Sequence, residues 1–186
     1  MSGLRDWIAQ LAHAEAQQRK EAAAELYREG RALGDAVVDG WRRDPAFAGL
    51  LAGEPTVGIA VSPETFARIR AAAGSPRLAE VPSDQDVQEF ELHLGETRLD
   101  ILTTRTGAGA IARFLEKQGE GIQQVEYPVT DVDCATNIVG QRFGLTPVYS
   151  AKRPGADGTQ VNFFLAATPE GKKVLIELVE APQPPS

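Results

Sequence analysis

The chain has 186 residues, 42% of them hydrophobic, and its formal net charge is −7 at pH 7 with a pI near 4.9. This length suits one compact unit or two small modules, and the hydrophobic content is ample for a buried core, which excludes global disorder. The acidic balance, with lysine and arginine scattered along the chain, argues against general binding to nucleic acid or to anionic membranes.

The single cysteine, Cys134, excludes an internal disulfide and fits a reducing compartment, so we expect a cytoplasmic protein. Cys134 falls in a predicted helix with no histidine near it in sequence, and we interpret it as a small apolar helix residue. The first residues lack the basic leader and continuous apolar stretch of a signal peptide. Nowhere do about 18 apolar residues run together, so no membrane-spanning helix is expected.

Residues 3 to about 50 are predicted to be helical. Leu4, Trp7, Ile8 and Leu11 follow a helical period, and alanine, glutamate, glutamine and arginine dominate the stretch. Such an amphipathic segment must bury its apolar stripe. Packing on the chain's own core is favoured, while covering a cleft or pairing with a second copy in a homodimer are the alternatives.

Two glycines predict an interruption of this helical segment. Gly30 and Gly34 indicate a break, after which Asp35 is expected to cap a second helix. We therefore assign residues 1–53 to an N-terminal helical extension in the form of a hairpin.

From Thr56 onward the pattern changes to strand, helix and three strands, and the same order returns from Gly121. The first copy consists of a strand at 56–61, a helix at 62–74 and strands at 77–81, 87–94 and 98–104. The second consists of a strand at 122–129, a helix at 131–144 and strands at 146–151, 160–167 and 174–180. Residues 107–118 predict a helix between the copies. This structural repeat predicts an α+β domain, residues 54–182, made of two βαβββ modules at about 55–104 and 121–181, with a tail at 183–186.

Alternation along the strands places polar side chains on one face of the predicted sheet. These are Glu89, Glu91, His93, Asp100, Gln124, Glu126 and Glu177. For Glu91 and Glu126 we favour a simple solvent-facing position, because antiparallel sheets commonly have one wet face. Asp100 and Glu177 stand among apolar residues, where a strand carboxylate is unfavourable without a partner, so they are the better functional candidates.

Three segments together resemble the vicinal oxygen chelate superfamily, and most of all its methylmalonyl-CoA epimerases. They are GETRLDIL at 95–102, FLEKQGEGI at 114–122 and VLIELVE at 174–180. The resemblance covers about residues 55–182 and implies two βαβββ modules around a concave cleft. It also implies a metal bound by the strands, and isomerase or lyase chemistry that moves a proton next to a carbonyl group.

Residue by residue, the resemblance implies four metal positions, one in each equivalent strand. They fall on Thr56, Asp100, Gln124 and Glu177, and the family's proton-moving glutamate falls on Glu89. The family has histidine where this chain has Thr56 and Gln124, so the expected metal site is altered.

The altered set changes the metal that the site would prefer. Thr56, Asp100, Gln124 and Glu177 offer only oxygen, which suits magnesium, manganese or calcium, and the absence of a cofactor is the alternative. His93 would add a nitrogen ligand if it faced inward, although a lone strand histidine is more often a surface residue. Glu91, His93 and Glu126 are the candidates for substrate binding.

Three functions are compatible with these residues. The first two imply a small-molecule ligand, and the third does not. The first is an enzyme in which Glu89 and Glu177 move a proton to and from a carbon beside a carbonyl. The second is a binding protein on the same fold that sequesters a small molecule, which the loss of two histidines favours. The third is a scaffold that uses the helical hairpin as its interaction surface. The retained carboxylates favour the enzyme.

Overall fold

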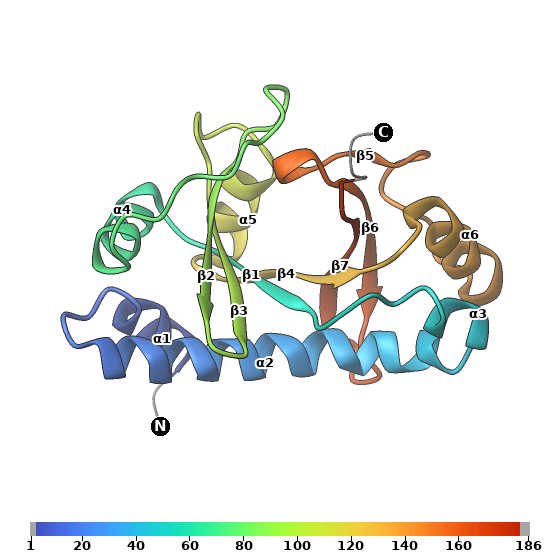
Figure 1. Ribbon diagram of the computed structural model, residues 1–186, viewed down its shortest axis with the longest axis horizontal. Coiled ribbons are helices and arrows are strands. Elements are labelled where there is room, and N and C mark those ends of the chain that lie inside the picture. Colours follow the sequence, from blue (N-terminus) through green and yellow to red (C-terminus); the bar gives the residue numbers. More distant parts are fainter. Residues whose placement is uncertain (1–2, 183–186) are drawn as a thin grey trace. The chain divides into compact units, whose positions relative to one another are not determined.

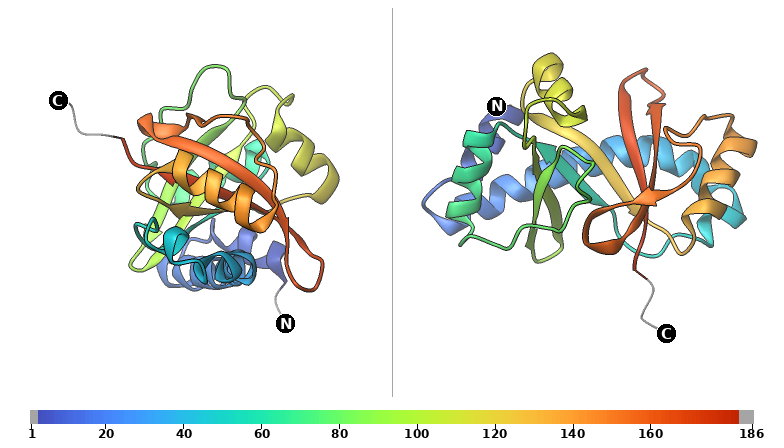
Figure 2. Two further views of the ribbon diagram at one scale, coloured as in Figure 1. Left: turned by 90° about the vertical axis from the view of Figure 1, so that its right-hand side faces the viewer. Right: turned by 90° about the horizontal axis from the view of Figure 1, so that it is seen from above.

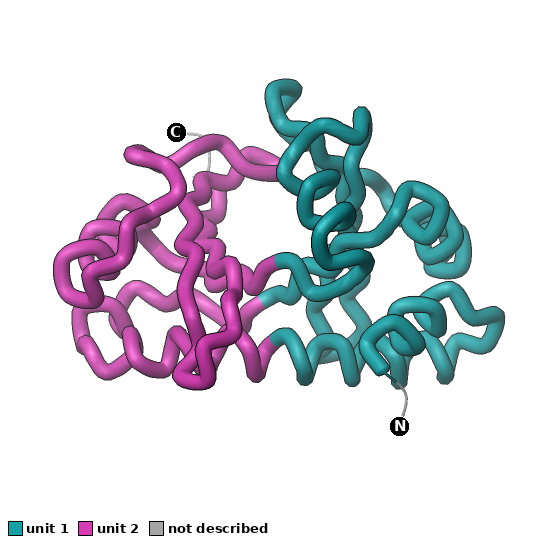
Figure 3. Tube along the Cα trace, turned by 180° about the vertical axis from the view of Figure 1, so that it is seen from behind, with its two compact units in different colours: residues 1–30, 56–123 teal, residues 31–55, 124–186 magenta. Residues whose placement is uncertain are grey.

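The computed structural model describes residues 3–182, and the chain divides into two compact units (Figures 1 and 3). Unit 1 combines residues up to Gly30 with Thr56–Gln123, and unit 2 combines Arg31–Pro55 with the residues from Gln124 onward. Helix α2 (Ala16–Arg42) and strand β4 (Gly121–Pro128) each give residues to both units. The division into an extension, a domain and a tail stays a prediction, and the tail at 183–186 lies outside the described residues.

Unit 1 is built on three strands covered by short helices (Figure 1). Its elements are α1 (Leu4–Gln10), the first part of α2, β1 (Thr56–Ala60), α4 (Pro63–Ala72), β2 (Gln88–Leu94), β3 (Thr97–Thr103) and α5 (Ala110–Gln118). Strand β3 is central, parallel to β1 and antiparallel to β2. The β2–β3 hairpin and helices α4 and α5 confirm the sequence prediction.

The two faces of the unit 1 strands have different coverings. On one face, Phe90 is buried and packs edge-on against Phe66 of α4, with ring centroids 4.9 Å apart. On the other face, Ala60 and Leu102 form an apolar cluster with Ile111 of α5. The polar residues of β2 and β3 lie further along this second face, since they alternate with Phe90 and Leu92.

Helix α4 has well-defined ends. Ser62 is its N-cap and accepts a hydrogen bond from the Thr65 amide, and Pro63 follows at the first helical position. At the other end, Gly74 donates its amide to the Ala71 carbonyl and Ser75 donates to that of Arg70, which is the Schellman arrangement.

Unit 2 contains four strands in the order β4-β7-β6-β5. Its further elements are α3 (Pro45–Ala48), α6 (Val132–Phe143), β5 (Arg153–Pro154), the 3₁₀ turn η1 (Ala156–Gly158), β6 (Gln160–Ala167) and β7 (Lys173–Glu180). Strand β7 is parallel to β4 and antiparallel to β6, and α6 packs on β6 and β7 (Figure 2). Trp41 of α2 packs edge-on against Phe164 of β6 and Phe47 of α3, which closes the core of this unit.

The predicted break at Gly30 and Gly34 is wrong, because α2 runs through both positions. A Cβ on Gly30 would overlap the Val57 side chain, and one on Gly34 would lie 2.5 Å from the Tyr127 hydroxyl. Both glycines therefore serve close packing of the helix against strands. Asp35 is not a cap, and it accepts a hydrogen bond from the Tyr127 hydroxyl at 3.0 Å.

The helical segment is interrupted earlier than predicted, between Gln10 and Ala16. There the Arg19 guanidinium donates to the carbonyl groups of His13 and Ala14, at 2.7 and 2.8 Å. These bonds satisfy carbonyls that a continuous helix would have used.

The strands predicted at 77–81 and 146–151 are also wrong. At 77–81 the backbone bond from the Ala79 amide to the Glu89 carbonyl does not extend into a ladder, and Pro82 follows without an N–H. At 146–151 the Asn162 side chain accepts from the Tyr149 amide and donates to the Tyr149 carbonyl, which replaces strand pairing there. Strand β5, with two residues, is what pairs with β6 in this part of unit 2.

None of the helices within residues 3–182 combines the length and the apolar character needed to cross a membrane.

Candidate functional site

Three predicted site residues come together in unit 2. Gln124 and Glu126 are two residues apart on β4 and share a face, and Glu126 lies opposite Glu177 in the parallel pairing with β7. The Gln124 amide nitrogen Nε2 donates to Glu177 Oε2 at 2.5 Å and to Glu126 Oε1 at 3.0 Å. Glu177 is only 7% exposed and Gln124 only 9%. The structure therefore forms a buried amide-carboxylate cluster from residues far apart in sequence.

The cluster has a simple electrostatic basis. Two carboxylates on neighbouring strands repel each other when both are charged, and burial of Glu177 adds a desolvation cost. The two N–H groups of one amide can serve both carboxylates, which offsets part of that cost. Gln124 thus holds the Glu177 carboxylate in place on the strand face.

Aromatic side chains that the sequence analysis did not single out lie beside this cluster. Phe163 of β6 is the direct partner of Glu177 in the antiparallel pairing. Its ring packs edge-on against that of Tyr149, with the ring centroids 6.0 Å apart. The guanidinium of Arg153 lies 4.5 Å from the centroid of the Tyr149 ring. Alternation along β6 could have placed Phe163 on the same face as the polar residues. Tyr149 could not have been placed from the sequence, because its position depends on hydrogen bonds between its backbone and the Asn162 side chain.

The unit 2 residues do not fit a resident metal in this arrangement. Gln124 turns its amide nitrogen, a donor, toward Glu126 and Glu177, so it does not offer an oxygen ligand on that side. Within residues 3–182 no group of three or more histidine, cysteine, aspartate or glutamate side chains has the geometry to hold a metal ion. We therefore derive no chemical step through a metal.

A second set of predicted residues comes together in unit 1. Glu91 of β2 lies opposite Asp100 of β3, and His93 is two residues further along β2. His93 Nε2 lies 3.7 Å from Asp100 Oδ1, and His93 Nδ1 lies 3.8 Å from Glu91 Oε2. Asp100 raises the pKa of His93, which outweighs the lowering effect of partial burial. At 3.7 Å the contact is too long for a hydrogen bond and becomes an ion pair when His93 is protonated, and Asp100 Oδ1 is buried without a hydrogen-bond partner among the described residues.

Thr56 and Glu89 also belong to unit 1. Thr56 opens β1 and lies on the face of Gly58, whose register partner is Asp100. Glu89 lies on the Glu91 face of β2 and is half-buried, with Leu102 as its partner in β3. The predicted residues thus form two sets, one in each unit.

Comparison with solved structures identifies similar proteins. A crystal structure of methylmalonyl-CoA epimerase from Mycobacterium tuberculosis is 31% identical and matches 73% of this chain and 91% of its own, with a TM-score of 0.59. A Streptomyces coelicolor methylmalonyl-CoA epimerase variant in complex with 2-nitronate-propionyl-CoA is 27% identical, matching 73% and 99%, with a TM-score of 0.59. A methylmalonyl-CoA epimerase in complex with methylmalonyl-CoA and NH4+ is also 27% identical, matching 71% and 95%, with a TM-score of 0.58.

The sequence matches no protein-family model and no curated protein. The structural matches nevertheless cover nearly the whole length of the similar proteins, at an identity that reaches 31%. The chain therefore belongs to the vicinal oxygen chelate superfamily, the family of the methylmalonyl-CoA epimerases to which it is similar.

Proposed function

We propose that this protein is an isomerase or epimerase that moves a proton at the carbon next to a carbonyl group of a small metabolite. The main support is the buried Glu177 carboxylate on a strand face, whose Oε2 accepts a hydrogen bond from Gln124 Nε2 at 2.5 Å. A buried, oriented carboxylate is the group that proton abstraction needs, because its position is set before the substrate arrives.

In the proposed reaction, a Glu177 oxygen takes the proton from the α-carbon. The electron pair of the broken C–H bond forms the enolate, and a proton then returns to the same carbon. Glu177 itself returns the proton when the configuration is retained, and inversion needs a second acid, the role that the family resemblance of the sequence implies for Glu89. Gln124 keeps the carboxylate oriented throughout.

The substrate class follows from the similar proteins and from the charge of the site. Solved structures similar to this chain contain methylmalonyl-CoA or 2-nitronate-propionyl-CoA, so acyl thioesters are the first compounds to test. Glu126 and Glu177 lie side by side, which disfavours a free carboxylate on the acyl group beside the thioester. We therefore expect a propionyl thioester, which has no stereocentre to invert, to exchange its α-protons at least as fast as methylmalonyl-CoA.

The test is exchange of the α-proton with deuterated water, followed by proton NMR on propionyl-CoA and methylmalonyl-CoA. Replacing Glu177 by glutamine should slow exchange about 100-fold or more, since that is the usual effect of losing a general base. The matched control is Glu170→Gln, which removes an exposed glutamate in the turn before β7 and should leave the rate unchanged. Wild-type exchange that is retained in the Glu177→Gln variant would refute the proposed role.

The same assay separates a metal-free site from a metal site. Because Gln124 satisfies the carboxylates as a donor, we expect exchange to continue after chelator treatment and metal content to be below stoichiometric. A stoichiometric metal that is lost in a Glu177→Ala variant, together with inactivation by chelator, would contradict this.

The aromatic pair of Tyr149 and Phe163 beside Glu177 favours a second candidate function, binding without turnover. Aromatic faces next to hydrogen-bonding groups suit an organic ligand whether or not a reaction follows. Saturable binding of an acyl thioester that is weakened by Tyr149→Ala, with no α-proton exchange, would establish this function instead.

A further inference from the structure

Unit 1 contains a cavity of about 300 Å³ between helix α4 and the ends of strands β2 and β3. We propose that this cavity binds a small monocarboxylate with an apolar body, separately from the proposed catalytic residues. Its lining consists of Pro63, Phe66, Ala67, Arg70, Ala71, Ser75, Leu78, Gln88 and Thr103.

The cavity lies on the opposite face of the strands from the predicted site residues of unit 1. Gln88 and Thr103 are register partners, and they share a face with Phe90, which packs against Phe66 of α4. Glu89 alternates with these residues and faces the other side. A ligand in the cavity therefore does not compete for the face that carries Glu89, Glu91 and Asp100.

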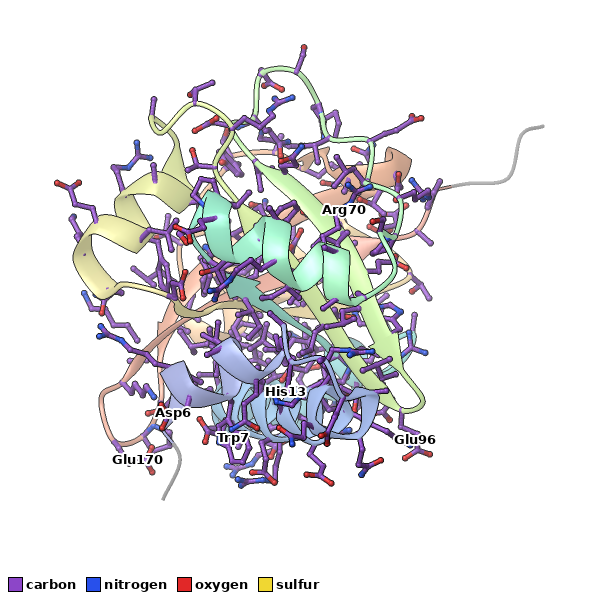
Figure 4. All side chains as sticks on the ribbon, turned by 90° about the vertical axis from the view of Figure 1, so that its left-hand side faces the viewer. Asp6, Trp7, His13, Arg70, Glu96 and Glu170 are labelled. Carbon is purple, nitrogen blue, oxygen red and sulfur yellow. The ribbon has the colours of Figure 1, made fainter. Side chains whose placement is uncertain are left out.

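Arg70 is the only charged residue in the lining. Its Nε donates to the Pro76 carbonyl at 2.8 Å, which fixes the guanidinium and leaves its two terminal nitrogens for a ligand. Within residues 3–182 it has no acidic partner, although the chain has an excess of acidic residues. Figure 4 shows Arg70 at the C-terminal end of α4, beside the strands. A guanidinium that has no acidic partner can bind a carboxylate through two parallel hydrogen bonds from its nitrogens.

The rest of the lining selects the body of the ligand. Phe66, Ala67, Ala71 and Leu78 supply apolar walls, while the Ser75 hydroxyl and the Gln88 amide supply hydrogen-bonding groups. The volume is at the lower end of the range for small-molecule sites, about 300 to 1,000 Å³. An aromatic ring or a short acyl chain bearing one carboxylate matches this combination.

The wall near Arg70 is shaped by an unusual backbone conformation. Ser75 has φ 58°, in the left-handed region that L side chains rarely adopt, and it follows Gly74 at φ 83°. The Ser75 amide closes this turn on the Arg70 carbonyl at 2.9 Å. The turn therefore brings Ser75 and the Pro76 carbonyl back to Arg70, which forms the site before any ligand binds.

The test is a ¹H–¹⁵N NMR titration of the full chain with benzoate, and with benzamide as the uncharged isostere. Benzoate should bind saturably with a millimolar Kd and shift the amides of Phe66 to Ala71, Ser75 and Leu78. Benzamide should bind at least tenfold more weakly, because it lacks the charge that pairs with Arg70. Equal binding of the two compounds, no saturation, or shifts confined to other residues would overturn the proposal.

Three variants locate the binding. Arg70→Gln should weaken benzoate binding at least tenfold, whereas Arg68→Gln, an exposed arginine on the same helix, should change it less than twofold. Ala67→Phe should also weaken binding at least tenfold, because the larger side chain fills the cavity while Arg70 remains. An equal loss in Arg68→Gln and Arg70→Gln would show general attraction to positive charge, and undiminished binding in Ala67→Phe would exclude the cavity.

Discussion

Asp86 organises the loop before α5 through a single carboxylate. It accepts hydrogen bonds from the Thr104 hydroxyl at 2.5 Å and from the amides of Thr106 and Gly109 at 2.7 and 2.9 Å, besides two further amides of this loop. These bonds, with Thr104 the strongest contributor, hold the pKa of Asp86 well below its usual range. The glycine-rich start of α5 is thus closed by a side chain of the chain itself, as the N-terminus of a helix favours negative charge.

Replacing Asp86 by asparagine should lower the melting temperature at neutral pH. It should also make the melting temperature fall less steeply as the pH is lowered. A depressed native pKa contributes stability above the unfolded pKa of about 3.9, and that contribution is lost as the pH falls below it. Melting curves between about pH 7 and pH 3 should therefore decline more steeply for the wild type than for Asp86→Asn. Glu96→Gln, in the exposed β2–β3 turn, is the control for loss of one charge. Parallel curves for wild type and Asp86→Asn would contradict the role of the carboxylate.

At the level of single side chains, alternation along the strands singles out candidate residues but not the interactions among them. Glu177 stands out in its strand because a carboxylate there needs a partner, and its burial agrees with that expectation. The partner, Gln124, is 53 positions away and depends on the pairing of β4 with β7. Arg70 and Phe163 gave no signal of function, since an arginine in a helix and a phenylalanine in a strand are ordinary.

Among the elements, helix α2 shows how packing overrides local signals. Glycine is unfavourable inside a helix by about 1 kcal/mol relative to alanine, which is why two glycines predict a break. Here the same glycines allow the helix to approach Val57 in one unit and Tyr127 in the other. The packing that this approach permits compensates for the lower helical propensity.

Replacing Gly34 by alanine should lower the free energy of unfolding by about 1 to 3 kcal/mol, the range for overpacking in a filled core. The new Cβ would lie 2.5 Å from the Tyr127 hydroxyl and 2.7 Å from Val125 Cγ1. Gly40→Ala on the same helix meets nothing within 4 Å and should raise the free energy of unfolding by up to about 1 kcal/mol. Urea denaturation measures both variants. A stabilising Gly34→Ala would show that the helix is free to move away from β4.

At the level of the whole molecule, a net charge of −7 sets the long-range electrostatics. An acidic protein repels anionic substrates at a distance and attracts cationic ones. A cytoplasmic location and a homodimer stay predictions, because neither follows from charge or fold.

If the protein acts on acyl thioesters, kcat/KM for a CoA ester should rise as salt is added. Between ionic strengths of about 0.01 M and 0.15 M the Debye length falls from about 30 Å to about 8 Å, which screens the repulsion between protein and CoA. The uncharged propionyl thioester of N-acetylcysteamine should show no such rise. Deuterium exchange rates of both compounds across this range provide the measurement, and a fall in kcat/KM for the CoA ester would contradict the expectation.

The amino-acid sequence by itself determined the order of a strand, a helix and a hairpin in each copy, namely β1, α4 and β2–β3 in the first and β4, α6 and β6–β7 in the second, together with helix α5 and the prominence of Glu177. These features depend on periodicity, caps and turn residues, which act over a few positions. Only the tertiary structure decided that α2 is continuous, that 77–81 and 146–151 are not strands, and that Gln124 is a hydrogen-bond donor to two carboxylates. Each of these depends on a contact between distant residues, and such contacts are set by strand register and close packing rather than by local preference.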